Sequence, residues 1–375
     1  MSFNRRFIMK SGIAAASTSF FGAGPSFFRP AFAAGTPGPN VPAGLVAAAK
    51  KEGQLNVITL PRDWANYGAA MDRFSELYGI KIDDANPDGS SAEELQAIRS
   101  LKSQKRAPDA VDVGLSFALT GMKEKLYAPY KVMTWNEIPD DTKDKDGHYY
   151  GDYYGVISFA ANKSVVKNTP QTWSDLMKPE YKGMIALNGS PLSAGAAIGA
   201  VFAAALAHGG SFDNVLPGVE FFAELAKIGN FNPAKGLAAS LVAGQTPITI
   251  DWDYLTLQYK KDNAAKVALD VVVPEGAQPF ANYYCQAISA YAPNPNAAKL
   301  WMEYMYSDEG QLSFLTGFAH PIRFNAMVAA GKIPDSMLAN LPPAAAYKGI
   351  KFASADQADK AKKVIAEAWP RLVKV

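Results

Sequence analysis

Cysteine and histidine are scarce in this sequence of 375 residues. The single cysteine, Cys285, excludes an intramolecular disulfide, so the fold must rest on its hydrophobic core. The three histidines, His148, His208 and His320, lie far apart in the sequence and, with one cysteine, offer little for a zinc or other soft-metal site. A dinucleotide-binding glycine pattern after a strand is also absent. We therefore expect no cofactor and no metal enzyme.

The chain also lacks an uninterrupted apolar run of the roughly 20 residues that a membrane-spanning helix needs. Residues 1–33 carry four cations and no acid. The pair Arg5–Arg6 lies in a run that resembles the twin-arginine export motif, and Ala31–Ala33 has the small-x-small pattern of a cleavage site. We therefore expect a cleaved signal in residues 1–33, a mature chain that begins at Ala34, and a periplasmic location.

An excess of positive charge is absent from the mature chain. The whole sequence has 37 Lys and Arg against 35 Asp and Glu, and loss of the four cations in the signal leaves 33 against 35. Nucleic acid and anionic membrane surfaces require a clustered basic face. We therefore expect no nucleic-acid partner.

Segments of strand length alternate with segments of helical periodicity along the mature chain. Strands are expected at residues 54–60, 80–83, 110–115, 183–187, 247–250 and 267–273. Helices are expected between them, with a capping box of Ser91 and Glu94 and an N-cap at Ser193. Further helices start at Asn294–Pro295 and after Ser307. Strands separated by helices predict parallel pairing and an α/β fold of two units.

Polar and aromatic side chains follow several of the expected strands. Ligands of open α/β sheets bind beyond the carboxyl ends of the strands. The residues found there are Arg62, Asp63, Trp64, Tyr67, Ser116, Phe117, Ser193, Asp251, Trp252, Asp253 and Tyr254. A carboxylate between aromatic faces suits an ammonium group, although Asp253 could instead cap a helix and Trp252 pack in a core. Arg62 could bind a ligand carboxylate through a bidentate hydrogen bond, or it could pair with a neighbouring aspartate.

Two tyrosine pairs and one arginine complete the candidates. Asp152 and Tyr154 lie in a tyrosine-rich stretch that suits either a binding wall or a half-buried strand. Tyr283 belongs to a second tyrosine pair, with a structural or ligand-stacking role. Arg323 is a candidate partner for an anionic solute, as is Ser193 at the start of its helix, where free N–H groups point outward.

Several stretches resemble the extracellular solute-binding proteins of ABC importers, in the branch that includes iron, polyamine and phosphonate binders. The stretches are Tyr154–Lys163, Pro170–Leu176, Pro179–Ile185, Ala292–Lys299 with Ser307–Gln311, and His320–Arg323. The resemblance implies the type II periplasmic binding protein fold, with two α/β lobes joined by crossover strands at a hinge. It also implies a small-molecule ligand and permease subunits in the inner membrane as partners, and we expect a monomer.

The resemblance also implies a division of the chain. Residues 41–157 and 288–325 would form lobe 1, and residues 158–287 would form lobe 2. Residues 326–375 would be a C-terminal helical segment. The crossover strands would fall near residues 158–162 and 273–289. Independently of the resemblance, the glycines and prolines of residues 34–44 predict a flexible leader.

We therefore predict a periplasmic substrate-binding component of an ABC importer that captures a small amine-bearing solute, polyamine-like or zwitterionic. The residues assigned to this site are Trp64, Trp252 and Tyr254 as walls, Asp251 or Asp253 as the partner of the ammonium, and Ser193 as the partner of an anionic end. One alternative is an anionic solute, such as an organic acid, sugar phosphate or phosphonate, held by Arg62, Ser193 and Arg323. Ferric iron as the solute is a further hypothesis, and an exported enzyme is a hypothesis of a different class.

Overall fold

The structure is a computed structural model that describes residues 39–87, 89–339, 341–342, 344–347 and 350–374. The expected signal and residues 34–38 of the expected leader lie outside the described residues.

The first lobe begins with alternating helices and strands. Its elements are α1 (Ala43–Glu52), β1 (Gln54–Ile58), α2 (Tyr67–Tyr78), β2 (Lys81–Ala85), α3 (Ser91–Leu101), β3 (Ala110–Gly114), α4 (Leu115–Lys123) and β4 (Tyr127–Ala128). Strands β1 and β2 pair in parallel, as the sequence predicts. The 3₁₀ turns η1 (Trp135–Glu137) and η2 (Asp140–Thr142) follow.

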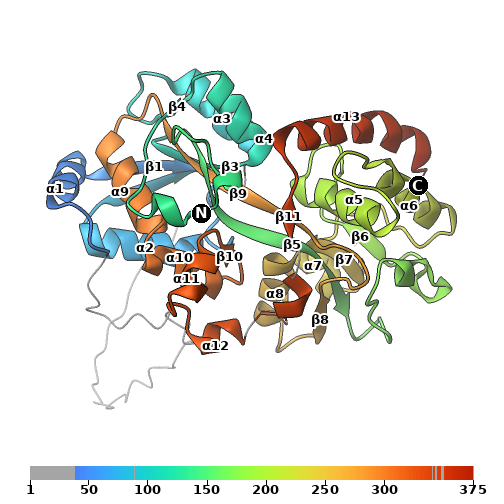
Figure 1. The fold of residues 1–375 in the computed structure, drawn as a ribbon. Coiled ribbons are helices and arrows are strands. Elements are labelled where there is room, and N and C mark those ends of the chain that lie inside the picture. Colours follow the sequence, from blue (N-terminus) through green and yellow to red (C-terminus); the bar gives the residue numbers. More distant parts are fainter. Residues whose placement is uncertain (1–38, 88, 340, 343, 348–349, 375) are drawn as a thin grey trace, which may run out of the picture. The chain divides into compact units, whose positions relative to one another are not determined.

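Two long strands belong to both lobes, β5 (Tyr150–Asn162) and β9 (Phe280–Ser289). The first part of β5 pairs with β9 in antiparallel register, with Val156 opposite Ala281, and its last part pairs with strands of the second lobe. At its far end β9 pairs with β3 and β4. Figure 1 shows β5 running from one group of strands into the other. These are crossover strands of the kind that the family resemblance implies.

The second lobe is built around the last part of β5. Its elements are η3 (Ser174–Met177), η4 (Pro179–Tyr181), β6 (Ile185–Leu187), α5 (Gly195–Ala207), α6 (Leu216–Lys227), α7 (Ala238–Val242), β7 (Ile248–Trp252), α8 (Asp253–Asp262) and β8 (Leu269–Val272). Strands β6 and β7 are parallel, whereas β7 and β8 are antiparallel to β5. Most of helix α5 is buried, and Gly218 of α6 lets the two helices approach closely: a Cβ on Gly218 would lie 2.0 Å from the carbonyl oxygen of Val201 in α5.

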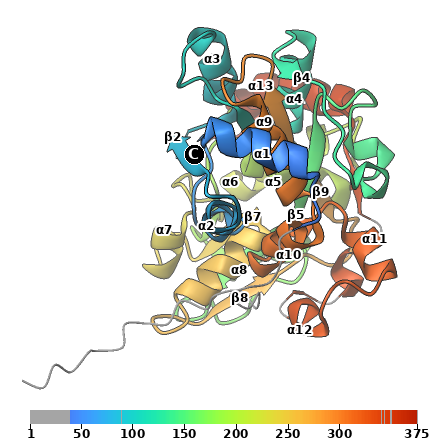
Figure 2. The ribbon, with the colours of Figure 1, turned by 90° about the vertical axis from the view of Figure 1, so that its left-hand side faces the viewer.

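The chain then returns to the first lobe before its final helix. The elements are α9 (Pro295–Met305), α10 (Asp308–Thr316), β10 (His320–Pro321), α11 (Phe324–Ala329), α12 (Asp335–Leu338), η5 (Ala344–Tyr347), β11 (Lys351–Phe352) and α13 (Ala355–Leu372). Helix α9 packs beside α1 (Figure 2). Helix α13 contacts both α6 and α4, so it ties the two lobes together (Figure 1).

Three local predictions differ from the structure. The capping box at α3 uses Ser90 and Glu93, one residue earlier than predicted. Helix α5 has Ala194 at its N-cap, with no side-chain hydrogen bond there, so Ser193 is not the cap. Among the described strands, parallel pairing is found for β1–β2, β6–β7 and β9–β11. The other pairs of the two crossover strands, including the pair that they form with each other, are antiparallel, so the sheet is mixed.

The part of the chain that the structure describes holds no helix with the length and apolar content needed to cross a membrane.

Candidate ligand-binding site

Four aromatic rings from both lobes meet where the lobes join. They are Trp64 from the loop after β1, Tyr153 from β5, Tyr254 from α8 and Tyr284 from β9, and we call them the aromatic cluster. Tyr153 stacks on Tyr284 with ring centroids 5.6 Å apart, and Tyr254 meets Tyr153 and Trp64 edge to face, at 5.7 Å in each case. The Trp64 indole N–H donates to the Tyr153 hydroxyl. Trp64 and Tyr284 remain partly exposed, so solvent reaches the cluster.

Strand register decides which tyrosine of each pair enters the cluster. Successive side chains of a strand point to opposite faces. Tyr154 is opposite Tyr283 across β5 and β9, and both lie on the face away from the cluster. A glycine also makes room: a Cβ on Gly155 would lie 2.5 Å from the Tyr254 ring, so only glycine fits here.

A network of buried acids lies behind the cluster in the first lobe. The Tyr67 hydroxyl is 2.8 Å from Asp112 Oδ2 and 2.9 Å from Asp152 Oδ2, and Gln286 Nε2 donates to the Tyr67 oxygen at 2.8 Å. Burial, with the neighbouring Asp152 and Glu94, raises the pKa of Asp112 well above its usual range. Burial likewise raises the pKa of Asp152 to about 7.

Two acids of the second lobe lie on the other side, at the end of β7. Asp251 accepts hydrogen bonds from Asn188 Nδ2 at 2.8 Å, the Tyr259 hydroxyl at 3.2 Å and its neighbouring backbone N–H. Burial raises its pKa to about 7, against the lowering effect of these hydrogen bonds and of Lys235. Asp253 accepts from the Val156 N–H and the Tyr347 hydroxyl, each at 2.9 Å. Burial raises the pKa of Asp253 to about 6.

Several buried polar atoms at this place have no hydrogen-bond partner among the described residues. They are the second oxygens of Glu94 and Asp112 and the Tyr254 hydroxyl. A buried polar atom without a partner costs free energy, which a bound group could recover. The Trp252 ring packs against Phe280 and Gly199, away from the aromatic cluster.

A lysine that the sequence analysis missed reaches Ser116 and Phe117. Lys362, on α13, donates to the Ser116 hydroxyl, and its ammonium lies 5.1 Å from the centre of the Phe117 ring. Burial lowers its pKa. Ser116 and Phe117 thus lie in the first turn of α4, next to a cation from the C-terminal helix.

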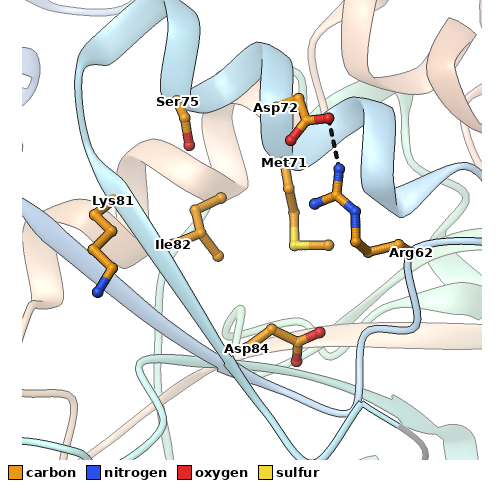
Figure 3. Close-up of a pocket in the computed structure, with 7 residues that line it drawn as sticks. All are labelled: Arg62, Met71, Asp72, Ser75, Lys81, Ile82 and Asp84. Carbon is orange, nitrogen blue, oxygen red and sulfur yellow. Dashed lines mark hydrogen bonds and ion pairs between the residues drawn. The ribbon is translucent and has the colours of Figure 1, made fainter. Parts of the chain in front are cut away.

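Arg62 and Asp63 lie at the surface. Arg62 pairs with Asp72 at 2.6 Å, with exposed side-chain fractions of 59% and 70%, and borders a small pocket of the first lobe (Figure 3). Figure 3 shows Asp84 and Lys81 on the opposite wall, from β2. Of its two possible roles, Arg62 therefore forms the pair with a neighbouring aspartate.

Four other candidates lie apart from the aromatic cluster. Tyr154 stacks on His320 at 5.0 Å, and Tyr283 meets Phe352 at 5.0 Å. Ser193 is exposed in the loop before α5. Arg323 is fully buried and donates to Glu137, Asp308 and the Tyr306 carbonyl oxygen. Arg323 therefore braces the first lobe.

Of the predicted residues, the structure brings Trp64 and Tyr254 into the aromatic cluster, with Tyr67, Asp152, Asp251 and Asp253 around it. The residues that the sequence analysis missed are Tyr153, Tyr284, Glu94, Asp112 and Lys362. One signal was available: Asp112 interrupts the otherwise apolar strand β3, and a buried carboxyl in a central strand needs a reason. Among the described residues, no group of three His, Cys, Asp or Glu side chains is placed to hold a metal ion.

A family model for bacterial extracellular solute-binding proteins matches residues 112–354, more than half of the chain. The chain therefore belongs to the bacterial extracellular solute-binding proteins. An uncharacterised protein of Haemophilus influenzae is 27% identical over 321 residues, which are 80% of this chain and 86% of that protein.

Solved structures of periplasmic binding proteins share the fold. AfuA of Actinobacillus pleuropneumoniae, with fructose-6-phosphate bound, is 20% identical with a TM-score of 0.66, over 85% of this chain and 99% of AfuA. The spermidine/putrescine-binding PotD of Streptococcus pneumoniae is 15% identical with a TM-score of 0.63, over 86% and 99%. The ferric ion-binding protein A of Pasteurella haemolytica is 18% identical with a TM-score of 0.62, over 84% and 98%.

Together these findings define the two-lobed type II fold of a periplasmic solute-binding component of ABC transporters. Proteins of this class bind small molecules and interact with ABC permeases. The three relatives have a sugar phosphate, polyamines and ferric ion as their solutes, so the choice of solute depends on the residues of this chain.

Proposed function

We propose that the protein captures a small solute bearing a positively charged amine at the aromatic cluster, and that its lobes close on the solute about β5 and β9. The observation that carries the proposal is the charge around the rings. Buried carboxyls surround them: Glu94, Asp112, Asp152, Asp251 and Asp253. Asp112, Asp251 and Asp253 act electrostatically on Tyr254, and Glu94 and Asp152 act on Tyr284.

These carboxyls have no bonded counter-charge in the described part of the chain. No Lys, Arg or His side chain described there forms a hydrogen bond or ion pair with any of them, and Lys235 acts on Asp251 from farther away. A buried carboxylate without a cation is costly, and a positively charged ligand removes that cost. Stacked aromatic faces add about 0.5–2 kcal/mol of attraction for the same cation.

Both lobes supply rings and acids. Trp64 and Asp112 come from the first lobe, and Tyr254 and Asp251 come from the second. A cation between them contacts both lobes only when they are closed, so its binding favours the closed conformation. This is the hinge closure that the sequence analysis expects, carried by β5 and β9.

Isothermal titration calorimetry of the mature chain from Ala34 tests the proposal. The solutes are putrescine, spermidine, choline and an aminophosphonate, compared with fructose-6-phosphate and citrate. Tyr284→Ala should weaken amine binding by about 5- to 30-fold, the equivalent of 1–2 kcal/mol for a desolvated cation–π contact. Tyr291→Ala, at a half-exposed tyrosine after β9, is the matched control. Heat from the anionic solutes alone would refute the amine assignment.

Lys362 supports a second candidate, an anionic solute. Its half-buried ammonium has a hydroxyl partner in Ser116 and no bonded carboxylate among the described residues. The variants Asp112→Asn and Asp251→Asn separate the two candidates. An amine site should lose most of its affinity in both variants, whereas an anion site should keep or gain affinity because negative charge is removed.

We also propose that the chain is exported, cleaved after Ala33 and works as a monomer. The pair Arg5–Arg6 and the Ala31–Ala33 pattern support the first two points. N-terminal sequencing of protein from the periplasmic fraction tests them, with Ala34 as the expected first residue. An intact Met1 on the mature protein would contradict cleavage, and light scattering after size-exclusion chromatography checks the monomer.

A further inference from the structure

The Tyr67 hydroxyl is shared by two carboxyls, although it has one hydrogen to donate. Asp112 Oδ2 lies at 2.8 Å and Asp152 Oδ2 at 2.9 Å, both within hydrogen-bond distance. A tyrosine hydroxyl donates once and accepts at its lone pairs, and an ionised carboxylate only accepts. If both carboxyls were ionised, one of them would face the Tyr67 oxygen with no hydrogen between the two atoms.

The other groups of the network do not supply the missing hydrogen. Gln286 Nε2 donates to the Tyr67 oxygen at 2.8 Å and to Asp152 Oδ2 at 3.2 Å. The Gln286 carbonyl oxygen accepts from the Trp301 indole N–H, which fixes the orientation of the amide. The Tyr153 backbone N–H donates to the other oxygen of Asp152. The contact between Asp112 and Tyr67 or between Asp152 and Tyr67 therefore needs a carboxylic-acid proton.

We infer that Asp112 and Asp152 hold one proton between them through the Tyr67 hydroxyl, and that this proton leaves to solvent when a cationic solute binds at the aromatic cluster. The inference rests on the proposed function for its second half. The step is an exchange: a neutral carboxylic acid loses its proton to water, and the resulting carboxylate faces the positive charge of the solute. No covalent bond other than O–H changes.

Asp112 and Asp152 form what we call the acid pair. The following groups, which face the acid pair, carry no positive charge that could take the place of its shared proton. Glu94 faces it from α3, Tyr67 from α2, Tyr254 from α8, and Tyr306 from the end of α9. Tyr153 of β5 and Tyr284 and Cys285 of β9 complete the surroundings. Burial among these neutral or acidic groups raises the pKa of both acids, to about 7 for Asp152, which supports a bound proton near neutral pH.

The acid pair of Asp112 and Asp152 is separated from the aromatic cluster by the Tyr67 ring. Asp152 precedes Tyr153 in β5, and the Tyr67 and Tyr153 rings are 6.3 Å apart. Asp112 also has a second oxygen that is buried and without a partner among the described residues. A cation against the Tyr153 and Tyr284 rings therefore acts on the acid pair through low-dielectric protein, where its field is weakly screened.

Titration calorimetry in phosphate and in Tris at pH 7.0, with choline as the probe and putrescine as a second probe, tests the exchange. Choline has no proton on nitrogen, so a difference in heat between the buffers reports protons released by the protein. We expect release of about half a proton to one proton per choline bound. Asp112→Asn is expected to bind choline more weakly, so it is titrated at choline concentrations that saturate the site. The release per choline bound should then be lost, because asparagine mimics the protonated acid. Asp72→Asn, at an exposed acid, should leave it unchanged.

The possible outcomes separate the two proposals. Binding of choline or putrescine with the same heat in both buffers would overturn the proton exchange and leave the amine site standing. Unchanged proton release in Asp112→Asn would overturn the assignment to this pair. Failure of every amine to bind would overturn the proposed function and the exchange with it. The infrared spectrum of the ligand-free protein tests whether the pair holds a proton. A carboxylic-acid carbonyl band at pH 7 that disappears in Asp112→Asn supports the shared proton, and the absence of such a band from the parent protein refutes it.

Discussion

Replacement of Arg323 with alanine is expected to destabilise the protein by about 3 kcal/mol without a specific loss of solute affinity. The guanidinium is fully buried and donates to Glu137 at 3.0 Å, to Asp308 at 2.8 Å and to the Tyr306 carbonyl oxygen at 2.7 Å. Removal of one partner of a buried charge pair costs about 3–5 kcal/mol. The low end applies here because Glu137 and Asp308 are 37% and 43% exposed and regain water. Asp308 also keeps its pair with Lys332 at 2.9 Å.

The midpoint of thermal unfolding reports this loss. For a chain of this size, 1 kcal/mol moves the midpoint by about 2 °C, so Arg323→Ala should unfold about 6 °C below the parent protein. Arg62→Ala is the matched control, because its pair with Asp72 is exposed and should contribute less than about 1 kcal/mol. Differential scanning calorimetry measures both. An unchanged midpoint in Arg323→Ala, with lost binding of an anionic solute, would refute the structural role and restore Arg323 to the binding site.

Three further substitutions test other parts of the structure. Gly218→Ala should cost at least about 2 kcal/mol in urea unfolding, because its Cβ meets the Val201 carbonyl oxygen at 2.0 Å; Gly44→Ala, with nothing within 4 Å, should not. Asp152→Asn should reduce the loss of stability between about pH 4 and pH 7. The pKa of Asp152 is about 7 in the folded protein and about 4 when unfolded, so its stabilising effect is complete below pH 4 and is lost as pH rises through 7. Identical pH profiles of the melting temperature would contradict this. Lys362→Met should keep amine affinity, measured by calorimetry, because the lysine has no bonded carboxylate among the described residues; a tenfold loss would contradict it.

The alternation of elements and part of the site could be predicted from the sequence. Trp64 and Tyr254 follow β1 and β7, and the rule that ligands bind beyond strand ends applies to both. Local signals suffice for such features, because strand length, helical spacing and the residue after a strand are all read within a few positions. Two of the four rings of the aromatic cluster could therefore be predicted from the sequence.

The rest of the site depends on pairing between distant segments. Tyr153 and Tyr284 could not be preferred over Tyr154 and Tyr283, because one residue of register decides the face, and β5 has an irregularity between Gly151 and Tyr154. Lys362 meets Ser116 only through the packing of α13 on α4. Arg323 looked available for a ligand, since nothing local shows that Glu137 and Asp308 converge on it.

The shared strands also set an order in which the protein can fold. Strands β5, β6, β7 and β8 lie between Tyr150 and Val272, so the sheet of the second lobe can assemble while the rest of the chain is still being made. Strand β3 must wait for β9, its partner, which begins at Phe280. Pairing across such a separation in sequence is slow. The lobe that starts the chain is therefore the last to be completed, and its unpaired strands are the segment most exposed to aggregation during synthesis.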